Sequence, residues 1–221
     1  GRKDELNKLL DHLNNTILSK GFSSLVVGKS GMGKSRLISE IQKYAGSKHA
    51  TLIQVVSNDG NQNQPYYPFI EGVKKLLEYL EMLPGKRKEE LTKMIKDNLG
   101  EQGRILSKII PELTPIIGEW DEKIKLSKKE SDVFFEKLKD LYLSFTSTSF
   151  PLIISFDDVQ FWDQGSIQFF QYFMSFIDER SVFVILALRK DEIGRIKDFY
   201  DFMVTQAQKN AIDIIDLNNF E

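Results

Sequence analysis

One glycine-rich stretch near the N-terminus constrains this chain more than any other feature. It reads Gly28-Lys29-Ser30-Gly31-Met32-Gly33-Lys34-Ser35 and fits the G-x-x-x-x-G-K-S/T pattern at every required position. An apolar run at residues 23–27 enters it, and residues 34–44 leave it with apolar side chains at helical spacing. Glycines let the backbone curl, so that amide N–H groups and a helix N-terminus can face an anion. The stretch therefore predicts a polyphosphate-binding loop.

Each part of this loop has an expected role in nucleotide binding. We expect Lys34 to reach the β- and γ-phosphates, and the hydroxyl of Ser35 to coordinate Mg²⁺ beside the β-phosphate. The backbone amides of residues 30–35 would form the phosphate cradle. The nucleotide-binding positions predicted along this stretch are Gly28, Ser30, Gly31, Met32, Gly33, Lys34, Ser35 and Arg36.

The rest of the chain alternates between strand-like and helix-like patterns. Helical spacing of apolar residues marks segments before the first strand and between the later strands. Near-continuous apolar runs in strands that alternate with helices indicate a parallel sheet covered on both faces. We therefore predict an α/β fold of the P-loop NTPase type with five mostly parallel strands, at residues 23–27, 51–56, 152–156, 182–188 and 211–217.

A polar segment rich in proline interrupts this alternation at about residues 61–130. Its pattern is largely helical, and we interpret it as an insertion between the second strand and the strand at residues 152–156. A further helical stripe at residues 133–145 is expected to lead back into the sheet. We treat residues 1–221 as one nucleotide-binding domain that carries this helical insertion.

Two more strands end in side chains suited to phosphate chemistry. The run at residues 152–156 is followed by Asp157 and Asp158, which is typical of a Walker B element. We expect Asp157 to hold Mg²⁺ and Asp158 to orient or deprotonate the attacking water, although an aspartate after a strand is also common in ordinary turns. Arg189 ends the run at residues 182–188, where it would contact the γ-phosphate or lie in solvent as a strand cap.

Charge and composition narrow the classes of partner. Lys and Arg number 30 against 32 Asp and Glu, so the formal net charge is -2 and no strong field attracts nucleic acid or an anionic membrane. The absence of cysteine excludes disulfides, thiolate metal sites and a cysteine nucleophile. The apolar runs are far shorter than the ~20 residues that span a bilayer. We expect a cytoplasmic domain without membrane contact or direct nucleic-acid binding.

Several stretches resemble a known family, the STAND-type signal-transduction ATPases of the AAA+-like branch. Phe156-Asp157-Asp158-Val159-Gln160-Phe161-Trp162-Asp163 is similar to the family's Asp-Asp-hydrophobic-Gln-Trp-x-Asp stretch, with an additional aromatic residue here. The opening residues 1–6 resemble the family's Gly-Arg-x-x-Glu-Leu, and residues 65–69 and 111–113 also agree with it. The resemblance is strongest with the AAA ATPase domains of large bacterial regulators and hybrid kinases.

This resemblance implies further details of the fold and the site. The strand of Arg189 would lie between the P-loop strand and the Walker B strand, and Arg189 would be the sensor arginine. Arg2 would lie near the adenine or ribose. A small helical or winged-helix lid usually follows in this family, and we expect it to lie beyond the end of this chain.

Three classes of function remain open at this point. The first is a regulatory switch, in which ATP binding promotes self-association through the full-length protein and ADP holds it inactive. The others are an active ATPase that drives remodelling or nucleic-acid handling, and a small-molecule kinase. The resemblance and the Asp157-Asp158 pair favour an ATP/ADP switch with Mg²⁺ and weak ATP hydrolysis. No Asn-Lys-x-Asp motif is present, which favours adenine over guanine.

Overall fold

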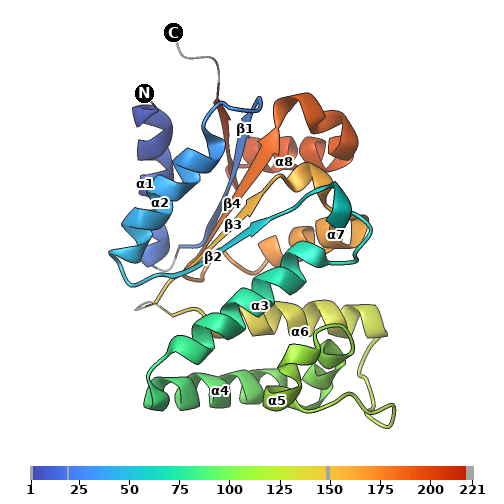
Figure 1. The fold of residues 1–221 in the computed structure, drawn as a ribbon. Helices are drawn as coiled ribbons and strands as arrows, with labels where there is room; N and C mark the ends of the chain where they lie inside the picture. The colour runs from blue at the N-terminus through green and yellow to red at the C-terminus, as the bar shows by residue number, and fades with distance from the viewer. Residues whose placement is uncertain (1, 19, 148–149, 218–221) are drawn as a thin grey trace. The chain divides into compact units, whose positions relative to one another are not determined.

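Five parallel strands form a single sheet in the computed structural model of the chain, which describes residues 2–18, 20–147 and 150–217 (Figure 1). The strand order is β2-β3-β4-β1-β5, and the four pairings are parallel. The predicted α/β class and the position of β4 between β3 and β1 are therefore confirmed. The strands are β1 (Phe22–Gly28), β2 (Thr51–Val56), β3 (Leu152–Asp157), β4 (Val182–Arg189) and β5 (Asp213–Leu217).

Helices cover both faces of this sheet, as the apolar runs in its central strands require. Every residue of β3 is buried, and so is every residue of β4 except Arg189. Figure 1 shows α1 and α2 on one side and α7 and α8 on the other. These helices are α1 (Lys3–Ile17), α2 (Lys34–Gly46), α7 (Gln164–Met174) and α8 (Lys197–Gln208).

The two faces have different cores. On one, the completely buried Leu9 and Leu13 of α1 join Ile38 and Ile41 of α2 in a mainly aliphatic cluster with residues of β1, β3, β4 and β5. The other core is aromatic: the Phe69 ring lies 5.0 Å from Phe156, 5.4 Å from Trp162 and 4.6 Å from Phe169 (centroid distances). Aromatic pairs at such distances contribute packing energy beyond the burial of their area. Both cores fix the strands whose ends carry the candidate site.

Residues 73–145 form a second compact unit, whose regular elements are all helices. Its core contains Val73, Leu80, Ile95, Leu106 and Leu138, each no more than 1% exposed. Its elements are the later part of α3 (Tyr67–Met82), α4 (Gly85–Leu99), the 3₁₀ segments η2 (Glu101–Lys108) and η3 (Pro111–Leu113), α5 (Thr114–Ile117) and α6 (Glu130–Ser144).

The bounds of this helical unit differ from the predicted insertion at about residues 61–130. The unit begins later, and it includes α6, which the sequence pattern had linked to the sheet. Leu138, Leu141 and Tyr142 are completely buried, and α6 contacts α4 and η2. Helical periodicity shows that a face is buried without showing which element buries it. That ambiguity explains the shift of the boundary.

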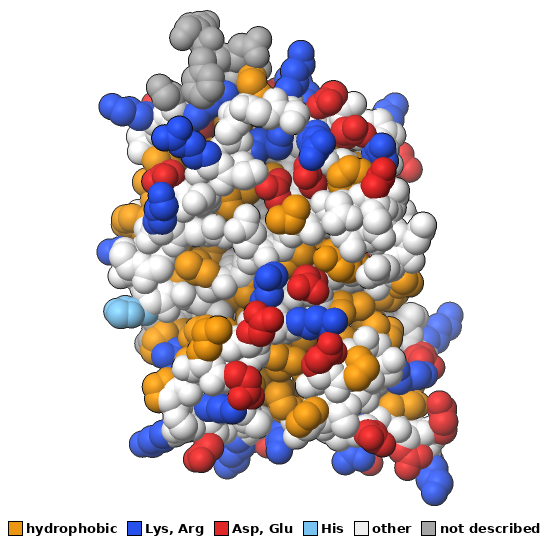
Figure 2. All heavy atoms as spheres, in the orientation of Figure 1, with side chains coloured by type: hydrophobic (Ala, Val, Ile, Leu, Met, Phe, Trp, Pro, Cys, Tyr) orange, Lys and Arg blue, Asp and Glu red, His pale blue; other side chains and the backbone are white. Residues whose placement is uncertain are grey.

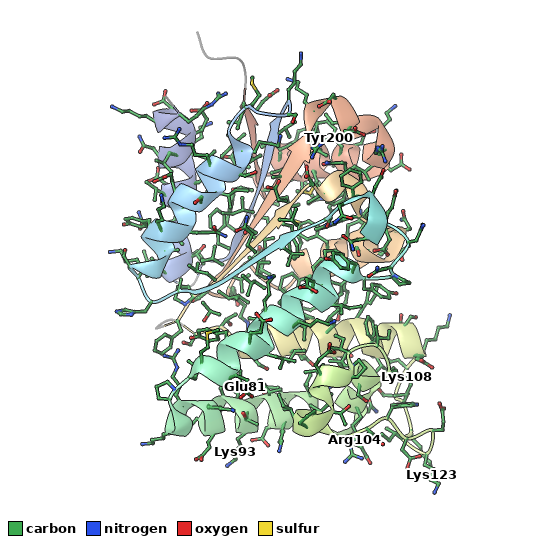
Figure 3. All side chains as sticks on the ribbon, viewed as in Figure 1. Glu81, Lys93, Arg104, Lys108, Lys123 and Tyr200 are labelled. Carbon is green, nitrogen blue, oxygen red and sulfur yellow. The ribbon has the colours of Figure 1, made fainter. Side chains whose placement is uncertain are left out.

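The surface of the helical unit is rich in ion pairs of long side chains. Lys108 Nζ lies 2.6 Å from Glu130 Oε1, Glu81 pairs with Lys88, and Arg104 Nε donates to the carbonyl of Ile117 at 3.1 Å (Figure 3 labels Glu81, Arg104 and Lys108). Exposed pairs of this kind contribute little stability each. These contacts connect neighbouring elements of the unit and identify no reactive centre.

The surface seen in Figure 2 carries basic and acidic side chains intermixed. This distribution agrees with the formal net charge of -2. Over the described residues, none of the helices has the length and apolar character that crossing a bilayer would take.

Candidate nucleotide-binding site

The predicted phosphate loop lies between β1 and α2. Gly28 is the last residue of β1, Lys34 is the first of α2, and Ser30 and Met32 lie in the turn between them. Gly31 has φ of 77° and Gly33 has φ of 88°, a left-handed backbone that side chains bearing a Cβ rarely adopt. The two glycines therefore allow the curl that would direct backbone amides at an anion.

The ammonium group of Lys34 is hydrogen-bonded to backbone carbonyl oxygens of the loop. Its Nζ donates to the carbonyl of Gly28 at 2.8 Å and to that of Lys29 at 3.1 Å, and the residue is 7% exposed. Burial lowers the pKa of Lys34, while the charges of Asp157 and Asp158 act in the opposite direction. A phosphate would supply the negative charge that this partly desolvated cation lacks.

The two predicted metal ligands are in direct contact. Ser35 Oγ donates a hydrogen bond of 2.6 Å to Asp157 Oδ2, although the two residues are 122 positions apart in the sequence. Asp157 ends β3 and is 8% exposed. A hydroxyl and a carboxylate are hard oxygen ligands, and Mg²⁺ bound to a nucleotide needs few protein ligands beyond these. The donor set therefore fits Mg²⁺.

Within the described residues, no group of three or more His, Cys, Asp or Glu side chains is arranged to hold a metal ion. A P-loop magnesium site has a different composition, because phosphate oxygens and water provide most of its ligands. The Ser35–Asp157 contact is the structural feature that matches it.

Asp158 and Arg189 form a bidentate ion pair beside the loop. Arg189 Nε donates to Asp158 Oδ1 at 2.8 Å, and Arg189 Nη2 donates to Asp158 Oδ2 at 2.8 Å. Burial alone would raise the pKa of Asp158, but the hydrogen bonds from Arg189 and Gln160 hold that pKa below its ordinary value. The hydrogen bond to Asp158 raises the pKa of Arg189. The side chains of Asp158 and Arg189, both predicted to be catalytic, are therefore hydrogen-bonded to each other.

Gln160 completes this arrangement, and the sequence had not indicated a role for it. Its side chain is fully buried; its Nε2 donates to Asp158 Oδ1 at 2.8 Å, and its Oε1 accepts from the backbone N–H of Arg189 at 3.3 Å. A buried amide with both ends hydrogen-bonded fixes its neighbours firmly. The signal was available in the quoted stretch, where Gln160 follows Asp158 by two positions.

Asp163, the last acidic residue of that stretch, has a structural role. It caps α7, because its Oδ1 accepts from the backbone N–H of Ser166 at 3.1 Å. Its Oδ2 also accepts from the backbone N–H of Tyr66 at 3.2 Å. Asp163 therefore ties the loop that follows β2 to the segment that follows β3.

Arg2 and Arg36 line a cavity of about 270 Å³ beside the start of α2, together with Lys3, Leu6, Gly33, Leu37 and Glu40. Arg2 Nη1 pairs with Glu5 Oε1 at 3.0 Å, and Arg2 Nη2 lies 3.4 Å from the carbonyl oxygen of Met32. The two arginines thus lie near the phosphate loop. Gly1, which opens the quoted Gly-Arg stretch, lies outside the described residues.

Known proteins are similar to this chain. Hybrid signal transduction histidine kinase G of Dictyostelium discoideum is 27% identical over 178 residues, which cover 78% of this chain and 5% of the kinase. Among solved structures, the unbound monoclinic form of the bacterial conjugative coupling protein TrwBdeltaN70 aligns with a TM-score of 0.37 and 12% identity, over 86% of this chain and 67% of that one.

A family model described as the AAA ATPase domain matches residues 1–185, which include the P-loop, the Asp157-Asp158 pair and the first half of β4. The match covers well over half of the chain. Together with the parallel sheet, it identifies the fold as that of an AAA ATPase domain. The chain belongs to the AAA ATPase domain family.

Proposed function

We propose that this chain is an ATP/ADP-binding switch domain of a larger signalling or transcription-control protein, with Mg²⁺ as cofactor and slow hydrolysis of ATP. The contact between Ser35 and Asp157 at 2.6 Å carries this proposal. It joins the end of the P-loop to the acidic end of β3, as Mg²⁺ coordination beside a β-phosphate requires. Lys34, held at the same loop, would neutralise the β- and γ-phosphates.

The cavity beside Arg2 and Arg36 supports a place for the nucleoside. Its volume of about 270 Å³ is close to the ~300 Å³ at which small-molecule pockets begin. Leu6 and Leu37 give it apolar walls for a base, and the arginines offer donors to ribose or phosphate oxygens. We assign adenine or ribose to this cavity, with Arg2 and Arg36 as nucleotide contacts.

The hydrogen bonds of Asp158 support the proposal of slow hydrolysis. A general base needs a free oxygen within reach of the attacking water, and both carboxylate oxygens of Asp158 accept hydrogen bonds from Arg189. Aspartate is also one methylene shorter than the glutamate usual in fast P-loop ATPases. Asp158 would therefore activate water poorly, and Arg189 would stabilise γ-phosphate charge only after leaving the pair.

A signalling context is supported by the hybrid histidine kinase, whose matching segment is a small part of a long chain. In a switch, ATP binding would favour a conformation that associates with neighbouring copies through the full-length protein, and ADP would favour the inactive one. No covalent change of a partner is needed for such a domain to act.

A turnover assay tests the switch against a motor. On protein freed of copurified nucleotide, we expect phosphate release with Mg-ATP well below the ~10 s⁻¹ of a typical enzyme. We also expect sedimentation of the full-length protein to show larger assemblies with ATP than with ADP. Fast turnover with the same assembly state in both nucleotides would contradict the switch.

A further inference from the structure

Arg189 emerges next to the phosphate loop. It ends β4, and in the parallel pairing of β1 with β4 it lies in register with Gly28, the first residue of the loop. Gly28 also accepts the hydrogen bond from Lys34. The strand pairing thus places the base of the Arg189 side chain beside the site where the proposed function puts phosphates.

The guanidinium of Arg189 is directed at a carboxylate. Its Nε and Nη2 make two hydrogen bonds of 2.8 Å to the two oxygens of Asp158. This fork geometry suits a carboxylate or a phosphate equally, because both present two oxygens to one edge of the guanidinium. Asp158 therefore occupies the edge of Arg189 that a γ-phosphate would otherwise use.

Asp158 shares its electrostatic surroundings with Lys34. The negative charges of Asp157 and Asp158 raise the pKa of Lys34 against the larger effect of burial, and the positive charge of Arg189 lowers it. These four ionisable groups are consequently close enough to act on one another. The negative charge of Asp158 would repel an incoming γ-phosphate. The positive charge of Arg189 would be less available to attract that phosphate, because Arg189 is already paired with Asp158.

We infer that Asp158 is a specificity-determining residue that competes with the γ-phosphate for Arg189, and so lowers the preference of the domain for ATP over ADP. The inference rests on the proposed function. ADP has no γ-phosphate, so it can bind while the ion pair stays closed. The γ-phosphate of ATP can contact Arg189 only after the ion pair has opened. The free energy needed to open the pair therefore weakens the binding of ATP and not that of ADP.

Asparagine is the replacement for Asp158 that best preserves its backbone conformation and its hydrogen bond with Gln160. Asp158 has φ of 58° and ψ of 48°, a left-handed conformation that asparagine adopts readily and alanine does not. The side-chain oxygen of the introduced asparagine would still accept from Gln160 Nε2. Asp158→Asn therefore keeps the local geometry while it removes the charge and one of the two acceptors that hold Arg189.

Calorimetric titration of the wild type and Asp158→Asn with ADP, and with the non-hydrolysable ATP analogue adenylyl imidodiphosphate, tests the inference. We expect Asp158→Asn to tighten binding of the analogue about five- to tenfold and to change ADP affinity less than about twofold. Asp191→Asn is the matched control, because Asp191 is exposed and also acts on the charge of Lys34. It should leave the ratio of the two affinities unchanged.

A double-mutant cycle separates competition from a general charge effect. In an Arg189→Gln background, Asp158→Asn should no longer raise the preference for the analogue over ADP, since no guanidinium remains to be released.

A fall in that preference in the Asp158→Asn single variant, or equal tightening of both ligands, would overturn the inference. Failure of the wild type to bind either nucleotide would contradict the proposed function instead. If Asp158→Asn does not fold, Arg189→Gln alone should lower the preference for the analogue over ADP relative to the wild type, and an unchanged or larger preference would overturn the inference.

Discussion

Replacing Lys34 with alanine is expected to weaken ATP binding on the order of 100-fold or more while the domain stays folded. The Nζ of Lys34 lies against the backbone of the P-loop, where it donates to Gly28 and Lys29. Without it, the β- and γ-phosphates would meet the loop with no ammonium to neutralise them. Calorimetric titration and circular dichroism measure the two parts of this expectation.

Lys29→Ala is the matched control for this substitution. Lys29 lies in the same loop and carries the same charge, but its side chain is exposed. We expect it to change ATP affinity by only a few-fold, as is usual for an exposed, solvent-screened charge. Equal losses in the two variants would show that general loop charge, and not the position of Lys34, controls binding. Full affinity in Lys34→Ala would remove the site assignment.

Phe156→Ala is expected to cost about 3–5 kcal/mol of unfolding free energy. Phe156 is 1% exposed, and its ring lies 5.0 Å from that of Phe69 and 5.2 Å from that of Trp162. Truncation would leave a cavity in the aromatic core directly before Asp157 in the chain. Urea denaturation followed by circular dichroism measures the loss, and weaker Mg-ATP binding should accompany it because Asp157 would lose its rigid support.

Phe176→Ala provides the comparison for this core substitution. Phe176 is 40% exposed, so we expect it to cost less than about 1 kcal/mol. Similar losses from Phe156→Ala and Phe176→Ala would contradict the view that the aromatic core supports the site.

The sheet could be predicted because its residues obey simple rules. The buried strands β3 and β4 are continuous apolar runs, and the P-loop marks the end of β1 without ambiguity. The helical unit was harder, because α4 has many charged residues and short 3₁₀ segments follow it. Such short segments lack the periodicity that reveals a longer helix. The sequence therefore indicated a helical insertion but not its bounds.

The site was predictable as a set of residues but not as a set of contacts. The motif pattern pointed to Ser35 and Asp157, and the structure brings them within hydrogen-bond distance. The pairing of Asp158 with Arg189 depends on the order of β3 and β4 in the sheet, which only the family resemblance suggested. Gln160 was missed because its residue type predicts exposure, and only its place in the stretch similar to the family, two positions after Asp158, indicated a role.

Titration of the wild-type chain with ATP, ADP and GTP, with and without Mg²⁺, tests the central claim most directly. The account predicts saturable binding of one adenine nucleotide per chain, weaker or absent GTP binding, and stronger ATP binding when Mg²⁺ is present. Absence of binding to any of the three nucleotides, or GTP bound as tightly as ATP, would contradict an adenine-nucleotide switch.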